Sequence, residues 1–262
     1  MSKDELLQVI EEEICKAQAQ TALLVKNLDS GETLLEHEAD KSMVSASIIK
    51  VPIMLSALEL VKEGGYSLHS KFEMPEAAIL YDTEVFEYGG GKYTLDELLV
   101  WMIINSDNTA ANFLIDILTP DRINDFCRRY SLNATRLERK MLDYKAVEAG
   151  RNNYTSVKDM ELLFCALHNR SILTPGLCDY ALSVLKRQRH KKLAMRYIGD
   201  EVEAVHKTGA LDCLKHDTGI FYLKNTSYYF AAFVSGAPDD GYAARWIGRI
   251  SALVYEYYKD SK

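Results

Sequence analysis

The sequence predicts an α+β protein in which an antiparallel sheet, flanked by helices, carries an inserted all-α lobe. Strand patterns occur only near the two ends of the chain, over 22–37 and 205–234, whereas helical periodicity dominates the residues between them. This order favours one discontinuous α/β lobe, formed by 1–45 and 195–262 and interrupted by an all-α lobe over 46–194. We expect the functional site in the cleft between the two lobes.

The N-terminal elements are a helix and a hairpin. Helical periodicity covers 3–18, and the apolar run over 22–25 then predicts a strand. The turn residues Asp29-Ser30-Gly31-Glu32 follow, and 33–37 predicts a second strand that returns beside the first. This hairpin supplies one part of the predicted sheet.

The central part of the chain shows helical patterns, among them 95–102 and 110–117. The stretch Ser156-Val157-Lys158-Asp159 resembles a capping box that opens a further helix, with Asp in place of Glu or Gln at its fourth position. These patterns are the basis for predicting an all-α lobe.

The C-terminal part returns to strands and ends in a helix. Three apolar runs, 205–209, 219–223 and 228–234, are separated by short polar turns, which is typical of an antiparallel meander. The helical pattern over 240–259 places one set of apolar residues on a single face: Ala244, Ile247, Ile250, Val254 and Tyr257. Both chain ends therefore contribute to the same α/β lobe.

Composition argues against several classes of function. The net charge of −7 over 262 residues lacks the basic footprint of a nucleic-acid or anionic-membrane binder. No uninterrupted apolar stretch approaches the roughly 18 residues that indicate a membrane-spanning helix. We interpret the basic run 187–192 as a solvated loop. The six histidines show no metal-ligand spacing, so we expect no metal and no other cofactor.

The first residues and the cysteines bear on the compartment. The N-terminal segment has neither the basic region nor the apolar core of a secretory signal. The five cysteines are an odd number without a CxxC pair, which indicates reduced thiols. We therefore expect a cytoplasmic protein, or a secreted one if a signal peptide has been removed. The oligomeric state stays open.

The segment Ala46-Ser47-Ile48-Ile49-Lys50 places a lysine in an apolar run, where an ammonium loses its hydration. Residues i and i+3 share a helix face, so Ser47 and Lys50 can meet. Desolvation lowers the pKa of a lysine, and the neutral amine is a base that can activate a hydroxyl nucleophile. S-x-x-K occurs about once by chance in a chain of this length. A second copy, Ser183-Val184-Leu185-Lys186, is interpreted as ordinary helix surface.

Two further motifs support a catalytic interpretation of this S-x-x-K motif. Ser106-Asp107-Asn108 follows an apolar helix pattern, and Lys207-Thr208-Gly209 lies in a predicted strand. S-x-x-K, S-D-N and K-T-G are together the signature of class A β-lactamases and penicillin-binding proteins. The chain resembles this superfamily of penicillin-recognising serine enzymes over nearly its whole length. The resemblance implies a β-lactamase/transpeptidase-like fold and the chemistry behind β-lactam antibiotic resistance.

The resemblance implies three catalytic residues. Ser47 would attack an amide or lactam carbonyl and form an acyl-enzyme, while Lys50 takes its proton. Ser106 would relay a proton to the leaving nitrogen, because expulsion of an amine anion is prohibitive. Asp107 is expected to anchor the turn.

The resemblance assigns substrate binding to five residues: Asn108, Lys207, Thr208, Gly209 and Ala210. Asn108 would donate to the acyl side-chain carbonyl and help to orient the lysine. Lys207 and Thr208 would face the substrate carboxylate and the relay serine. Gly209 would let substrate lie against the strand edge, and the backbone N–H of Ala210 would complete an oxyanion hole with that of the nucleophile. Structural roles stay open, with Thr208 and Gly209 as plain strand residues and Asn108 as a helix N-cap.

The chain departs from the class A pattern where a glutamate activates water for deacylation. The landmark Thr135-Arg136-Leu137-Glu138-Arg139 is present, but the position of the glutamate holds Met141 and that of a later asparagine holds Lys145. Three nearby carboxylates lack the family's spacing: Glu138, Asp143 and Glu148. Glu138 and Asp143 are expected to pair with the loop arginines. We therefore expect impaired or atypical deacylation, with Lys50 or Glu148 as the replacement base.

A second departure lies on the strand after K-T-G. Secreted β-lactamases often carry an arginine there that helps to bind the substrate carboxylate, whereas this chain has His216 and Asp217. Either these residues lie near the site and alter recognition, or Asp217 merely pairs with Lys207 or Lys215.

Three functions stay open at this point. The first is a serine hydrolase acting on β-lactams, the second a D,D-peptidase or penicillin-binding protein, and the third a non-catalytic sensor that β-lactams acylate. Each takes a small molecule, either a β-lactam or an acyl-D-amino-acid-like amide, and none needs a nucleic-acid or membrane partner. Turnover of nitrocefin separates the first from the third, and a D-Ala-D-Ala peptide assay tests the second.

Overall fold

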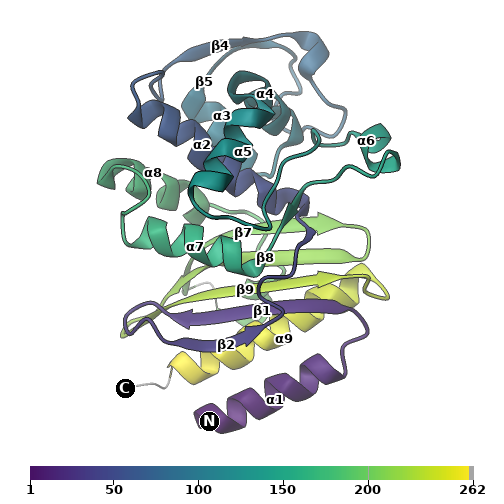
Figure 1. Ribbon diagram of the computed structural model, residues 1–262, viewed down its shortest axis with the longest axis vertical. Coiled ribbons are helices and arrows are strands. Elements are labelled where there is room, and N and C mark those ends of the chain that lie inside the picture. The colour runs from purple at the N-terminus through teal and green to yellow at the C-terminus, as the bar shows by residue number, and fades with distance from the viewer. Residues whose placement is uncertain (200, 260–262) are drawn as a thin grey trace.

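A five-stranded antiparallel sheet joins the two ends of the chain (Figure 1). The computed structural model describes residues 1–199 and 201–259. In spatial order the strands are β2 (Thr33–His37), β1 (Gln20–Asn27), β9 (Ser227–Ser235), β8 (Leu214–Tyr222) and β7 (Glu203–Leu211). Because β1 pairs with β9 along its whole length, the N-terminal hairpin and the C-terminal meander form one sheet. This order leaves β7 at an edge of the sheet.

The two faces of the sheet belong to two different layers of the core. One face is covered by α1 (Lys3–Cys15) and α9 (Asp240–Lys259), which lie below the sheet in Figure 1. Successive side chains of a strand point to opposite faces. On β9, Tyr228 and Phe230 pack with the α1 and α9 residues, whereas Tyr229 and Phe233 pack with the helical block. This explains why β9 is apolar without alternation, since both of its faces are buried.

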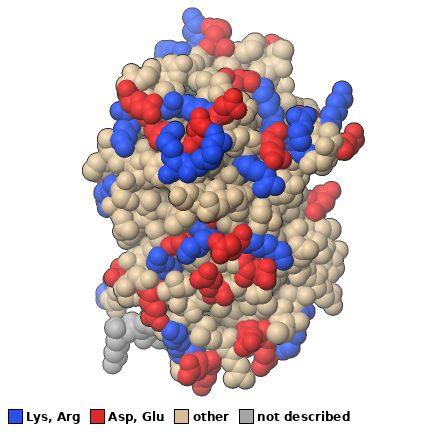
Figure 2. Space-filling view, viewed as in Figure 1, with Lys and Arg blue, Asp and Glu red and all other residues tan. Residues whose placement is uncertain are grey.

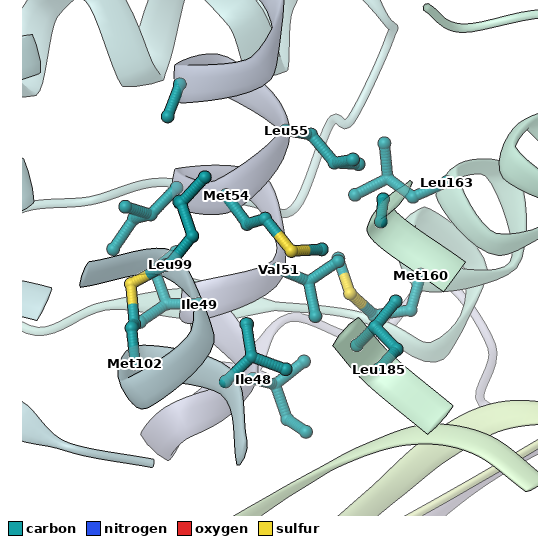
Figure 3. Packing of buried hydrophobic residues seen from close by; sticks show 14 of the residues in the cluster. Ile48, Ile49, Val51, Met54, Leu55, Leu99, Met102, Met160, Leu163 and Leu185 are labelled. Carbon is teal, nitrogen blue, oxygen red and sulfur yellow. The ribbon is translucent and has the colours of Figure 1, made fainter. Parts of the chain in front are cut away.

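The block on the other face contains these longer helices: α2 (Lys50–Lys62), α3 (Leu95–Ile104), α4 (Asn108–Leu118), α5 (Pro120–Arg129), α7 (Val157–His168) and α8 (Pro175–Lys186). Every residue of α2 from Lys50 to Glu59 is buried. In Figure 3, Leu99 and Met102 of α3 lie on one side of α2, and Met160 and Leu163 of α7 lie on the other. A helix that is apolar on all sides is a buried helix, so α2 is a fixed support for the residues at its N-terminal end.

Short elements complete the described part of the chain. Two strand pairs are β3 (Met43–Val44) with β6 (Tyr154–Thr155), and β4 (Lys71–Met74) with β5 (Gly91–Thr94). The remaining helical turns are η1 (Ala46–Ile49), η2 (Glu76–Ala78), α6 (Tyr144–Glu148) and η3 (Ala194–Tyr197).

The α+β fold class and the predicted order of elements are confirmed. The pairs β4–β5 and β3–β6 were not predicted, because strands of two to four residues are too short for a periodic signal. The first helix ends at Cys15 rather than at residue 18. The division of the chain at 45/46 and 194/195 stays a prediction.

The predicted capping box at Ser156 is half formed. The Ser156 side chain accepts from the backbone N–H of Asp159 and caps α7. Asp159 does not return that bond: one of its oxygens accepts instead from the Ala134 N–H at 2.9 Å and the Thr135 hydroxyl at 2.6 Å. The acid therefore ties α7 to the segment that precedes the 136–139 loop.

Basic and acidic side chains are interleaved on the face shown in Figure 2. Over α2 and α5, for example, Arg122 and Arg129 contact Glu59 and Glu63. No helix within 1–199 and 201–259 combines the length and the apolar character needed to cross a bilayer.

Candidate active site

Ser47 and Lys50 meet where η1 runs into α2. Ser47 lies in η1, which is one turn of 3₁₀ helix, and is half-buried. Lys50, the first residue of α2, is fully buried. Their Nζ and Oγ atoms are 3.1 Å apart. The i, i+3 spacing therefore brings the two side chains together as predicted.

Lys50 has a second set of partners from the α3–α4 connection. Its Nζ lies 2.5 Å from the carbonyl oxygen of Ser106, 2.7 Å from Oδ1 of Asn108 and 3.2 Å from Oγ of Ser106. Burial lowers the pKa of Lys50 from its usual 10.5 to about 7, although the Asp107 and Asp82 carboxylates act in the opposite direction. The amine can therefore be neutral near neutral pH while it remains hydrogen-bonded.

Ser106 sits in a rigid turn between α3 and α4. Its φ of +58° lies in the left-handed region, which a residue with a side chain adopts only when its surroundings hold it there. Asp107 supplies that restraint, since it caps α4 through the Ala110 N–H at 2.7 Å and accepts from the Thr83 hydroxyl at 2.6 Å. Asp107 thus has the anchoring contacts that we expected of it.

Lys207 approaches Ser106 from the opposite side. It lies on β7, is fully buried, and donates to Ser106 Oγ at 3.0 Å and to its neighbour's carbonyl oxygen, that of Thr208, at 2.7 Å. Burial and the nearby Lys50 together hold the pKa of Lys207 well below its usual value, against the attraction of Asp217. The Ser106 hydroxyl consequently lies between two lysine amines, each within hydrogen-bonding distance.

Asn108 is the first residue of α4 and links Lys50 to the loop between η2 and β5. Its Oδ1 accepts from Lys50, and its Nδ2 donates to Oδ2 of Asp82 at 2.6 Å. The alternative role as an N-cap is wrong, because Asp107 is the residue that caps this helix. No motif pointed to Asp82, since its importance depends only on a contact made across the fold.

Gly209 has a packing role that its motif did not indicate. A Cβ atom at this residue would lie 3.1 Å from the Ser45 carbonyl oxygen, 3.1 Å from Ile48 Cγ1 and 3.2 Å from Ala46 Cβ. The glycine therefore allows β7 to pack closely against η1, the turn that carries Ser47. Its expected role at the strand edge stays a prediction.

A Gly209→Ala variant is expected to lose about 1–3 kcal/mol of unfolding free energy, because β7 and η1 must separate to admit the methyl group. Urea unfolding measures the loss. Gly176→Ala in α8 is the matched control, since no atom lies within 4 Å of its added Cβ. That change should be neutral or stabilising by up to about 1 kcal/mol. Equal stability of the two variants would contradict the packing role of Gly209.

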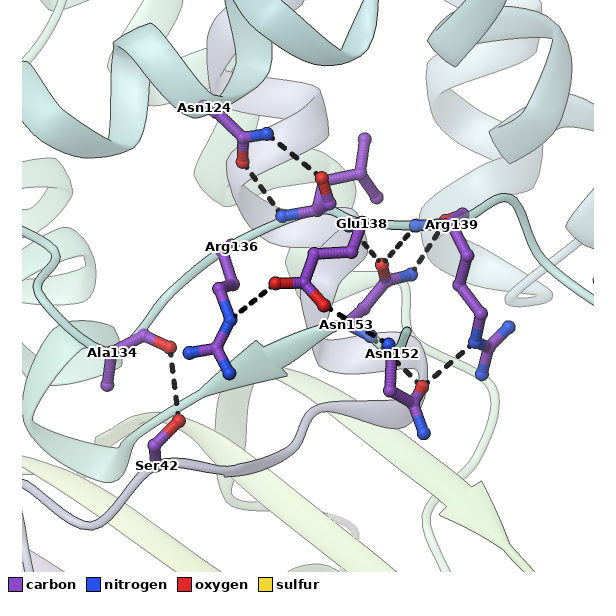
Figure 4. A network of polar contacts seen from close by, with 9 residues as sticks. Ser42, Asn124, Ala134, Arg136, Glu138, Arg139, Asn152 and Asn153 are labelled. Atoms are coloured by element: carbon purple, nitrogen blue, oxygen red, sulfur yellow. Dashed lines mark hydrogen bonds and ion pairs between the residues drawn. The ribbon is translucent and has the colours of Figure 1, made fainter. Parts of the chain in front are cut away.

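The loop after α5 is held by a network of polar contacts (Figure 4). Asn153 Oδ1 accepts from the backbone N–H groups of Glu138 and Arg139, and Asn152 Oδ1 accepts from Arg139 Nε. Glu138 pairs with Arg136 at 2.8 Å, one of the pairings we expected. Asp143 instead caps α6 through an N–H three residues further on.

Met141 occupies the part of this loop that approaches α4. Its backbone N–H donates to Asn112 Oδ1 at 2.7 Å, and its carbonyl oxygen accepts from Asn112 Nδ2 at 3.1 Å. Asn112 lies one helical turn after Asn108, so Met141 is held one turn from a direct partner of Lys50. Glu148, a candidate base by sequence, is exposed near the end of α6 and does not line the cleft.

His216 and Asp217 on β8 do not face the cleft. Asp217 is buried and accepts from His206 Nδ1 at 2.8 Å and from the Ala194 N–H at 3.0 Å. His216 is buried with Nε2 2.9 Å from the Val44 carbonyl oxygen, and burial lowers its pKa to about 4. The expected ion pairs of Asp217 with Lys207 or Lys215 are therefore wrong, since its hydrogen-bonding partners lie elsewhere and it acts on Lys207 only through its charge.

The cleft beside Ser47 has a volume of about 650 Å³. Its lining includes four of the predicted site residues: Ser47, Ser106, Thr208 and Ala210. The second S-x-x-K copy lies elsewhere, on α8. There Ser183 donates to the Tyr180 carbonyl oxygen and Lys186 pairs with Glu203, so these two side chains do not contact each other.

The arrangement supports proton transfer at a hydroxyl. A neutral amine has two N–H donors and one lone pair. The Ser106 and Asn108 oxygens can take the two donors of Lys50, which leaves the lone pair for the Ser47 hydroxyl.

Residues 5–258 match a protein family described as the beta-lactamase enzyme family. The chain is 31% identical to a beta-lactamase of Rhodobacter capsulatus over 144 residues, which are 53% of this chain and 48% of that protein. It is 24% identical to a D-alanyl-D-alanine carboxypeptidase of Bacillus subtilis over 151 residues, 56% of this chain and 38% of that protein. The chain thus spans less than half the length of these relatives.

The solved structure of PBP-A is similar along almost the whole chain, with 27% identity, a TM-score of 0.89 and coverage of 98% of this chain and 97% of PBP-A. A PBP-A variant has been solved as an acyl-enzyme complex with penicillin-G, and this chain is 26% identical to it with a TM-score of 0.87, over 99% of this chain and 96% of the variant.

Proposed function

Because the chain belongs to the beta-lactamase enzyme family, we propose that it is a serine hydrolase that β-lactams acylate at Ser47. The observation that carries the proposal is the contact set around one buried amine: Lys50 Nζ lies 3.1 Å from Ser47 Oγ and 3.2 Å from Ser106 Oγ. An activated nucleophile needs a base within this range. Beta-lactamase and PBP-A relatives support the same chemistry.

In the proposed acylation, Lys50 takes the hydroxyl proton while Ser47 Oγ bonds to the lactam carbonyl carbon. The carbonyl oxygen becomes an oxyanion, for which the backbone N–H groups of Ser47 and Ala210 are the proposed donors. Collapse of this intermediate breaks the C–N bond. Ser106 protonates the leaving nitrogen and recovers a proton from the Lys50 ammonium, so the net transfer is from Ser47 to nitrogen.

Lys207 and Thr208 are the proposed receptors for the substrate carboxylate. An anion beside Lys207 would favour its protonated form, which burial opposes in the empty site. Binding of the carboxylate would therefore be coupled to uptake of a proton by Lys207. Asn108 is proposed to bind the acyl side chain while it keeps its contact with Lys50.

Deacylation is proposed to be slow, because the loop segment held by Asn112 presents Met141 rather than a carboxylate. Intact-mass spectrometry after incubation with benzylpenicillin should show a persistent adduct that is absent from Ser47→Ala. Absence of both the adduct and nitrocefin hydrolysis would overturn the proposal. Rapid turnover would contradict the slow deacylation but not the acylation of Ser47. It would indicate that another group acts as the base for deacylation.

A D,D-peptidase is the second candidate. Methionine at position 141, in place of a carboxylate, favours it, and so does the similarity to the B. subtilis D-alanyl-D-alanine carboxypeptidase. Release of D-alanine from an acyl-D-Ala-D-Ala peptide tests this candidate. Acylation without nitrocefin turnover or D-alanine release would instead identify a sensor.

The rate of acylation is expected to rise with pH, with a midpoint near the Lys50 pKa of about 7. Below that pH the amine is protonated and cannot accept the Ser47 proton, so the rate falls as the pH decreases. Stopped-flow measurement of acylation by nitrocefin between pH 5 and 9 tests this; both pH limits are chosen to lie about two units from the midpoint. A flat profile would exclude Lys50 as the base.

A further inference from the structure

The basic segment 187–192 is exposed except for Gln188, as expected of a solvated loop, and it also borders the cleft. Four of its side chains line the cleft beside Ser47 and Ser106: Arg189, His190, Lys191 and Lys192. The lining also includes Lys215 from β8. Sequence alone could not place this segment, because nothing in a run of charges indicates what lies across from it.

The segment is held against the end of α3. The buried Gln188 side chain donates to the Ile103 carbonyl oxygen at 3.0 Å, and the Arg189 N–H donates to the Ile104 carbonyl oxygen at 3.2 Å. The Arg189 guanidinium lies 3.3 Å from Asn105 Oδ1. Asn105 directly precedes Ser106, so these bonds position the basic side chains beside the relay serine.

The charge of the cleft differs from that of the whole chain. The lining contains four cationic side chains, Arg189, Lys191, Lys192 and Lys215, and among the described residues only one carboxylate, Glu84. Lys215 is paired with Asp240 at 2.6 Å. Arg189 and Lys192 add positive charge to this side of the cleft in a protein of net charge −7, and a cleft lined by one sign of charge attracts the opposite charge.

The position of the segment indicates which half of a substrate it would meet. In the proposed acylation Ser106 protonates the leaving nitrogen, so the leaving-group half lies toward Ser106 and Asn105. The acyl half lies toward Asn108, whose amide is bound to the Asp82 carboxylate. Basic side chains therefore border the leaving-group half, whereas on the acyl half Asn108 is bound to a carboxylate.

The two sets of cations lie at different depths of the cleft. Lys207 is fully buried beside Ser106, whereas Arg189 and Lys192 are exposed at the rim of the cleft. We propose that the preferred substrate carries a second acidic group on its leaving-group half, bound by Arg189 and Lys192. This inference rests on the proposed function, with the first carboxylate received by Lys207 and Thr208.

Two cephalosporins provide a matched pair of probes. Cefamandole and cefonicid share their acyl side chain, but cefonicid carries a sulfonate on the substituent of the leaving-group half. Cefonicid is expected to acylate the wild-type chain about tenfold faster at low ionic strength. In Arg189→Gln/Lys192→Gln the ratio of the cefonicid acylation rate constant to that of cefamandole should fall to about one. Added salt should lower the same ratio in the wild type.

Two controls isolate the position of the charge. Lys62→Gln/Lys224→Gln removes two exposed charges that lie outside the cleft and should preserve the cefonicid preference. Carbenicillin differs from benzylpenicillin by a carboxylate on the acyl half, near Asp82. The wild type should acylate with carbenicillin no faster than with benzylpenicillin. The ratio of these two acylation rate constants should be the same in Arg189→Gln/Lys192→Gln.

The failure of the inference can be told apart from that of the proposed function. Equal rate constants for cefamandole and cefonicid in the wild type, or a preference that persists in Arg189→Gln/Lys192→Gln, would overturn the inference and leave the function intact. If neither compound acylates Ser47, the proposed function fails. Calorimetric affinities of Ser47→Ala for the two compounds then decide the inference, since this binding requires no acylation.

Discussion

A Lys50→Met variant is expected to acylate at Ser47 about a thousandfold more slowly than the wild-type chain, within the range that general-base catalysis contributes. Methionine retains most of the length of the buried side chain but cannot accept the hydroxyl proton at 3.1 Å. It also cannot return a proton to Ser106. The rate at which the benzylpenicillin adduct appears in intact-mass spectra measures the effect.

The fold provides a matched control for this substitution. Lys186→Met changes the lysine of the other S-x-x-K copy, which is exposed and paired with Glu203. That variant should acylate at the wild-type rate. Circular dichroism should show that Lys50→Met is folded, because loss of the desolvated amine offsets the unpairing of the Ser106 and Asn108 acceptors. A folded Lys50→Met with the wild-type rate would exclude Lys50 as the base.

A Met141→Glu variant is expected to shorten the lifetime of the Ser47 adduct about a hundredfold, since it adds a general base for water. The backbone at 141 is held from both sides by Asn112, one turn of α4 after Asn108. A carboxylate introduced there would be attached to a backbone held in place close to the proposed acyl-enzyme. The decay of the adduct after removal of free penicillin measures the change.

Met141→Gln is the control for shape and polarity, because it matches glutamate in size and cannot act as a base. Met141 is 8% exposed, so the new carboxylate would be largely buried, its pKa would rise, and stability should fall by about 1–3 kcal/mol. Thermal unfolding measures this loss. If the adduct decays equally slowly in the Glu and Gln variants, the position of residue 141 is not suited to deacylation.

The order of elements and the catalytic candidates could be predicted because each depends on local patterns. Strand β7 was predicted from its apolar run, and Lys207 was placed on it by the K-T-G motif. The i, i+3 spacing of Ser47 and Lys50 brings the two side chains together without help from distant residues. Asp82 could not be found in this way, since 26 residues separate it from Asn108, the residue it binds.

The same distinction explains the corrections. The packing role of Gly209 could not be predicted, because the close approach of η1 to β7 depends on packing between segments more than 150 residues apart. Asp217 was expected to pair with a lysine, yet the register places it opposite Thr208, on the same face as His206, to which it is hydrogen-bonded. A pattern shows which face a residue occupies, and it does not show which residue lies opposite.

Sequence alone determined which residues are the candidates for the proposed chemistry: a serine with a lysine three residues later, a second serine in a turn, and a lysine on a strand. It also determined that the usual carboxylate is missing, because Met141 stands in its place. Only the tertiary structure decided the environment of these groups. Burial brings the pKa of Lys50 to about 7, and the anchoring of Gln188 carries a basic segment to the cleft. Motifs encode the reacting atoms, whereas desolvation and charge depend on everything that packs around them.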